Sequence, residues 1–89
     1  MELPEEVVND VRTRLRRAAG QVQGVERMLS EGRDCRDVLS QLQAARRALD
    51  QAGLKLLAAG FTYCVENPEK AAADGYARET MEKLFMQMG

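Results

Sequence analysis

Apolar residues recur at alternating spacings of three and four along the first third of the chain. The repeat begins after Pro4 and is interrupted at Gly32, which predicts a helix over about residues 5–30. Glu5 and Glu6 lie in its first turn, where the positive end of the helix dipole favours acidic side chains. The seam extends over three heptads, so this helix is expected to pack against another helix. Its members are Val8, Val11, Leu15, Ala18, Val22, Val25 and Leu29.

A second seam predicts a longer helix over about residues 34–66. Asp34 is a suitable N-cap residue, and Pro68 disfavours helical backbone in the residue before it. At 1.5 Å per residue this helix would be about 50 Å long, which exceeds the width of a globule of this size. A single antiparallel neighbour cannot cover all of its apolar surface, so we expect an all-α hairpin that assembles into a four-helix-bundle dimer. The seam consists of Val38, Leu42, Ala45, Leu49, Ala52, Leu56, Ala59 and Tyr63, and a second apolar row consists of Leu54, Leu57, Phe61 and Val65.

A shorter amphipathic segment follows Asp74 and Gly75, and it predicts a third, covering helix over about residues 75–88. Gly53 and Gly60 lie within the second helix, where each costs about 1 kcal/mol relative to alanine. They indicate close backbone packing or a dispensable side chain. No linker separates the segments, so residues 1–89 are predicted to form a single helical domain.

Composition narrows the class of protein. No apolar stretch approaches the roughly 20 residues of a membrane span, and the N-terminus is acidic, so a cytoplasmic location is expected. The chain has no histidine, which argues against hydrolytic catalysis and against nickel or zinc binding, and we expect no enzyme activity. In a reducing compartment, Cys35 and Cys64 are expected to be free thiols, metal ligands or redox-active groups.

The charge is segregated along the chain. A net charge of −1 and a pI of about 5.4 argue by themselves against a nucleic-acid partner. However, residues 1–10 carry four acids and no base, whereas residues 11–36 carry seven arginines and three acids. A basic surface on the first helix therefore remains compatible with DNA binding.

The two cysteines occupy opposite ends of the second predicted helix. Cys35 follows the cap, where free backbone amides, the helix dipole and the neighbouring arginines Arg33 and Arg36 favour its thiolate. Cys64 comes 29 residues later, about 43 Å away along a straight helix but only about 20° away around its axis. The thiols cannot meet within one chain, but an antiparallel two-fold partner would bring each Cys35 to the other subunit's Cys64. The alternative is that both pack as small apolar groups, which suits Cys64 better than Cys35.

Several short elements have a recognisable spacing: Arg14-Leu15, Gly20-Gln21-Val22-Gln23-Gly24-Val25, Met28-Leu29, Asp34-Cys35-Arg36-Asp37-Val38, Gln41-Leu42, Ala48-Leu49 and Cys64-Val65. Over about residues 7–66 the chain resembles the copper-sensing operon repressor family. That resemblance implies an all-helical dimer of dimers that represses transcription until an effector binds at the dimer interface.

The resemblance also implies double-stranded operator DNA as a partner and Arg14 as a DNA-binding residue. Charge alone adds Arg16, Arg17, Arg46 and Arg47 as DNA-binding candidates. The alternative is a solvated arginine face that pairs with nearby acids.

The resemblance to the family does not by itself determine which effector the protein binds. Copper-responsive members have a histidine four residues before the second cysteine, and Gly60 stands at that position here. The sulfur-species-responsive branch keeps only the two cysteines and is the better match. It implies a repressor without a cofactor, which leaves DNA when a persulfide or polysulfide links Cys35 to Cys64 of the partner subunit.

Two other functions remain open. Thiolates are soft ligands that select Cu(I), so a Cu(I)-responsive repressor with Cys35 and Cys64 as ligands is the first alternative. A thiol sulfurtransferase or a helical adaptor without DNA binding is the second.

Overall fold

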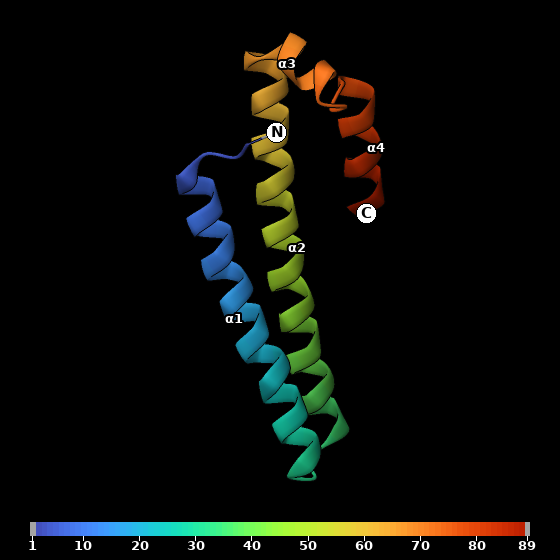
Figure 1. Cartoon of the computed structure of the whole chain (residues 1–89). Coiled ribbons are helices and arrows are strands. Elements are labelled where there is room, and N and C mark those ends of the chain that lie inside the picture. Colours follow the sequence, from blue (N-terminus) through green and yellow to red (C-terminus); the bar gives the residue numbers. More distant parts are fainter. Residues whose placement is uncertain (1, 89) are drawn as a thin grey trace.

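The computed structural model describes residues 2–88, which form four α-helices and no strand (Figure 1). The helices are α1 (Glu5–Ser30), α2 (Cys35–Glu66), α3 (Pro68–Ala73) and α4 (Arg78–Met88). Helices α1 and α2 form a long antiparallel hairpin, and α4 runs back along the C-terminal half of α2 (Figure 1). The molecule measures 54 × 25 × 14 Å, so the predicted all-α hairpin and its length are confirmed.

Two residues, Gly32 and Asp34, determine the turn between α1 and α2. Gly32 has a φ of 69°, a backbone conformation that glycine adopts at no steric cost. Asp34 then caps α2, because its side-chain Oδ2 accepts a hydrogen bond of 3.2 Å from the backbone N–H of Arg36. The predicted boundary between the two long helices is therefore confirmed.

The prediction for the C-terminal part was wrong in one respect. The region contains two helices instead of one, because α3 begins at Pro68 immediately after α2 ends. Proline suits the first turn of a helix, and the alanines that follow favour helical backbone. Gly75, with a φ of 86°, ends this segment, and α4 begins only at Arg78.

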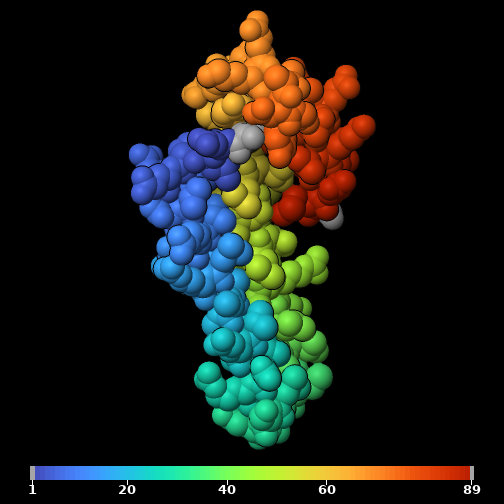
Figure 2. Space-filling model, in the orientation of Figure 1, coloured from blue at the N-terminus to red at the C-terminus, as the bar shows by residue number. Residues whose placement is uncertain are grey.

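The core between α1 and α2 consists of small side chains. Val11 and Ala18 of α1 are buried against the region of Ala45 and Ala52 of α2, each at most 5% exposed. Small side chains allow two helices to approach closely but bury little apolar surface. The hairpin core is therefore thin. Figure 2 shows that the lower part of the hairpin is narrower than the part that carries α3 and α4.

Many large apolar side chains of the predicted seams remain exposed. We call seven of them the apolar stripe; they recur every seven residues on each helix and are between 36% and 64% exposed. Within one chain the seams are thus only half covered, which is the property that the sequence pattern predicted for an associating hairpin. The apolar stripe consists of Val8, Leu15, Val22 and Leu29 of α1 and Leu42, Leu49 and Leu56 of α2.

Helix α4 packs onto α2 through methionines and glycines. A Cβ atom at Gly60 would collide with the side chain of Met81, which is 3% exposed, and one at Gly53 would collide with that of Met88. The rings of Phe61 and Phe85 add an edge-to-face contact with centroids 6.4 Å apart. Of the two interpretations drawn from the sequence, close packing holds at both glycines, but the neighbours are methionine side chains instead of backbone. Among residues 2–88 no helix is long and apolar enough to span a membrane.

Candidate sensor thiols and basic groove

Cys35 is the first residue of α2 and is exposed. Backbone amides at this position have no partner within the helix. Of the two neighbouring arginines, Arg33 is engaged in a 3.7 Å ion pair with Asp37 one turn later. The structure therefore places this thiol where a ligand or an electrophile can reach it.

Cys64 lies near the other end of α2 and is partly buried. Its Sγ donates a hydrogen bond to the backbone carbonyl of Tyr76, 3.0 Å away. It also lines a cavity of about 630 Å³ under α3 and the start of α4, together with Phe61 and Val65. This thiol is more enclosed than Cys35, and it is tied to the segment that leads into α4.

The two thiols do not come together within the chain. Both lie on the continuous 32-residue helix α2, 29 residues apart, which corresponds to about 43 Å. The expected separation within one subunit is therefore confirmed. A site that uses both thiols needs a second copy of the chain.

Position 60, which could supply a third metal ligand, is a glycine covered by a packed side chain. Gly60 is buried and carries no side chain, and the side chain of Met81 occupies the space above it. Within residues 2–88 no three histidine, cysteine, aspartate or glutamate side chains are grouped as a metal site. The donors that remain are two soft thiols, which suit Cu(I) in linear coordination and do not suit nickel.

A second candidate site, which we call the basic groove, lies between α1 and α2. It is an open cavity of about 330 Å³ on the side of the hairpin core where polar side chains gather. Its lining residues are Arg14, Arg17 and Gln21 of α1 and Ala44, Arg47, Ala48 and Gln51 of α2.

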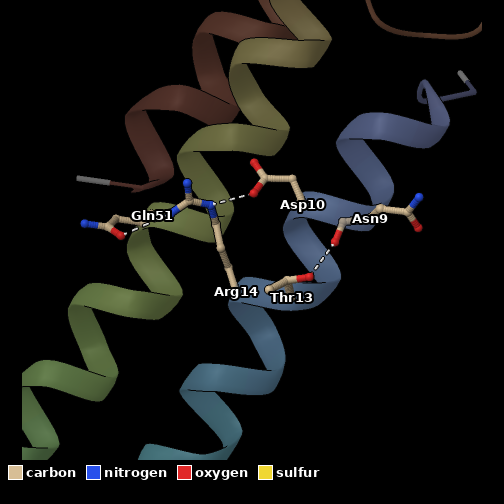
Figure 3. A network of polar contacts seen from close by, with 5 residues as sticks. All are labelled: Asn9, Asp10, Thr13, Arg14 and Gln51. Atoms are coloured by element: carbon tan, nitrogen blue, oxygen red, sulfur yellow. Dashed lines mark hydrogen bonds and ion pairs between the residues drawn. The ribbon is translucent and has the colours of Figure 1, made fainter.

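Arg14 is held in place across the basic groove. Its Nε lies 3.3 Å from Asp10 Oδ1, and its NH1 donates to Gln51 Oε1 at 3.3 Å (Figure 3). The link to Gln51 joins two residues 37 positions apart and therefore joins α1 to α2.

Three of the five arginines selected from the sequence meet in this groove, namely Arg14, Arg17 and Arg47. Arg16 and Arg46 are exposed and do not line it. Sequence reasoning missed Gln21 and Gln51 as groove residues. The available signal was their spacing, since Gln21 lies seven residues after Arg14 and Gln51 four after Arg47.

Comparison with known proteins places this arrangement in a family. The family model for metal-sensitive transcriptional repressors matches residues 8–87. The copper-sensing transcriptional repressor RicR of Mycobacterium tuberculosis is 44% identical over 62 residues, 70% of this chain and 62% of RicR. The copper-sensing transcriptional repressor CsoR of Bacillus subtilis is 33% identical over 77 residues, 86% of this chain and 76% of CsoR.

A solved structure agrees with these relatives. The copper-sensing repressor CsoR with Cu(I) from Geobacillus thermodenitrificans superimposes with a TM-score of 0.74 at 32% identity, covering 99% of this chain and 88% of that one. The chain is thus an all-helical protein of the repressor class, and it belongs to the metal-sensitive transcriptional repressor family. The family membership inferred from the sequence is confirmed, although the match spans less than two thirds of RicR.

Proposed function

We propose that this protein is a transcriptional repressor whose binding to operator DNA is relieved by Cu(I) held between Cys35 of one subunit and Cys64 of another. The observation that carries the proposal is the placement of both thiols on α2, at opposite ends and on nearly the same side. An antiparallel partner helix turns this placement into two equivalent two-thiol sites.

The apolar stripe supports the assembly that this site requires. Seven large apolar side chains exposed along one hairpin are more than a monomeric soluble protein of this size normally leaves uncovered. A second hairpin packed on the stripe would form a four-helix bundle. Exposed Leu54 and Val65, on the second apolar row, offer a further surface through which dimers would pair into a tetramer.

Copper is favoured as effector by the relatives and by the donor set. Two of the relatives are named as copper-sensing repressors, and the solved structure holds Cu(I). Two thiolates can bind Cu(I) without a third ligand. DNA would be bound by the arginines of the basic groove, with Arg16 and Arg46 adding longer-range attraction to phosphates.

A sulfur-responsive repressor is the second candidate, and the absence of a side chain at Gly60 favours it. The Cys35 thiolate would attack a hydropolysulfide, form a persulfide and release a chain one sulfur shorter. The Cys64 thiolate of the partner would then attack the inner sulfur, form the disulfide and expel hydrosulfide. This chemistry needs only the two cysteines.

The test follows DNA binding and effector uptake in the same preparation. Cu(I) is titrated against bathocuproine while binding to a duplex from the protein's own promoter region is measured by anisotropy. We expect tight uptake of Cu(I) and release of the duplex, and Cys35→Ser should bind the duplex without being released. Cu(I) uptake without release would reject copper as effector.

A parallel arm distinguishes the remaining functions. Treatment with polysulfide followed by intact-mass measurement should leave the subunits unlinked if Cu(I) is the effector. Linked dimers together with release would favour sulfur species. Failure to bind the duplex at any salt concentration would favour an adaptor or a sulfurtransferase.

A further inference from the structure

We infer that the basic groove, formed by Arg14, Arg17, Gln21, Ala44, Arg47, Ala48 and Gln51, is a seat for one phosphate group. The inference rests on the proposed DNA binding and deepens it, because it names the side chains that would hold a backbone phosphate. It also separates the arginines of the chain into those that bind a phosphate directly and those that only contribute charge.

The composition of the groove suits an anion with several oxygens. Three arginines from two helices line it, and guanidinium donors match the geometry of phosphate oxygens. Ala44 and Ala48 contribute only methyl groups to its lining, so the side chains on α2 leave room for a ligand. A volume of about 330 Å³ accommodates a phosphate with some of its water.

Gln21 adds a side-chain amide to the lining of the groove. Its Oε1 is buried and has no hydrogen-bond partner, whereas buried polar atoms in native proteins are nearly always paired. The two ends of a glutamine amide are assigned from their surroundings, so rotation of the amide exchanges Oε1 and Nε2. A glutamine amide carries two N–H donors, so Gln21 can donate to an oxygen of a phosphate held in the groove.

Arg14 is prepared for such a ligand. Its contacts with Asp10 and Gln51 fix the guanidinium at the edge of the groove (Figure 3). They use two of the five N–H donors of an arginine, so three remain for a phosphate. Holding the side chain in advance reduces the entropy lost on binding.

The groove stays open when the apolar stripe is covered. Arg14, Gln21 and Ala48 each directly precede a residue of the stripe, namely Leu15, Val22 and Leu49. One residue corresponds to a rotation of about 100° around a helix. A second copy packed on the stripe would therefore lie to the side of the groove, and the groove would face the solvent of the assembled protein.

Two matched pairs of variants test the seat in the full-length protein. Arg17→Gln is compared with Arg16→Gln, and Arg47→Gln with Arg46→Gln, so each pair removes the same charge from adjacent positions. Binding of a promoter duplex is followed by anisotropy over a range of salt concentrations. We expect Arg17→Gln and Arg47→Gln to lower the slope of log affinity against log salt by about 1, and the other two variants to lower it by much less. Equal effects within each pair would overturn the inference.

Gln21→Leu tests the amide without changing the charge. We expect weaker duplex binding with an unchanged salt slope and a thermal midpoint at least as high as that of the unaltered protein, since an unpaired buried atom is removed. Unchanged duplex binding by this folded variant would contradict a role for Gln21 in the seat.

A titration with inorganic phosphate separates the seat from the proposed function. Side-chain Nε–H signals of the arginines are followed by NMR, with sodium chloride at matched ionic strength as control. We expect saturable shifts for Arg14, Arg17 and Arg47 and none for Arg16 and Arg46. If duplex binding fails but these shifts appear, the seat serves a free phosphate and the proposed repressor function is rejected. Uniform or absent shifts overturn the seat.

Discussion

The thiol of Cys64 donates a hydrogen bond to the backbone carbonyl of Tyr76, so this cysteine is joined directly to the segment that leads into α4. Only the protonated thiol can donate this bond. A thiolate bound to Cu(I) cannot, so occupation of the site would release Tyr76.

The first prediction concerns this bond. We expect Cu(I) saturation to speed amide hydrogen exchange in α4 several-fold while exchange in the middle of α1 is unchanged, because α4 loses one of its attachments to α2. Hydrogen exchange with mass spectrometry measures both segments. Cys64→Val, which cannot donate, should show the faster α4 exchange without copper. Exchange in α4 that is insensitive to both changes would mean that the bond does not hold the helix.

The second prediction tests the sharing of each site between subunits. Cys35→Ser and Cys64→Ser are mixed and allowed to exchange subunits. Each heterodimer then contains one site with both thiols and one with neither. We expect the mixture to regain tight Cu(I) binding that neither parent shows, at one ion per heterodimer, measured by competition and native mass spectrometry. A mixture that binds no better than its parents would show that the site is not built from Cys35 and Cys64 of different chains.

The third prediction addresses the apolar stripe. Leu49 and Leu54 are equally exposed in the single chain, at 49% and 48%, but only Leu49 belongs to the stripe. We expect Leu49→Glu to give monomers, because it buries a charge in the dimer, and Leu54→Glu to leave dimers intact. Sedimentation velocity distinguishes these states. The reverse order of effects would place the dimer interface on the second apolar row.

The fourth prediction compares the two packing glycines. Gly60→Ala should destabilise the fold by up to about 2 kcal/mol, because the end of the buried Met81 side chain must shift and this overpacking outweighs the roughly 1 kcal/mol that alanine gains in helix propensity. Gly53→Ala should be nearly neutral: Met88 is 38% exposed near the end of α4, and alanine gains about 1 kcal/mol in helix propensity. Urea unfolding gives both values. If contact with the Met81 side chain is the cause, Met81→Ala should remove most of the penalty of Gly60→Ala.

Much of this architecture follows from local pattern. The heptad seams, the Asp34 cap and the positions of Gly32 and Pro68 are properties of neighbouring residues, and they predicted both long helices. The short helix α3 was missed because its apolar residues are alanines, which show no amphipathic pattern over so few positions.

The basic groove could be recognised only from the fold, because its residues come from two helices. Arg17 and Arg47 carry the same charge as Arg16 and Arg46, and only the register of α1 against α2 brings the first two together. The unpaired atom of Gln21 is likewise a consequence of packing between helices, so no pattern within one helix could reveal it. The reason for Gly60 became visible only with Met81, which lies 21 residues further along the chain.

The unbroken course of α2 has a mechanical consequence. The α2 lining of the basic groove, residues 44–51, lies about midway between Cys35 and Cys64. Each of the two cysteines of α2 therefore lies about 20 Å along the helix from the groove. In the proposed dimer, each effector site joins the Cys35 end of one α2 helix to the Cys64 end of the other. When both sites are occupied, each α2 helix is held at both of its ends. If DNA is bound at the basic groove as proposed, effector and DNA act on the same helix, and a small rotation of α2 would move the arginines of the groove.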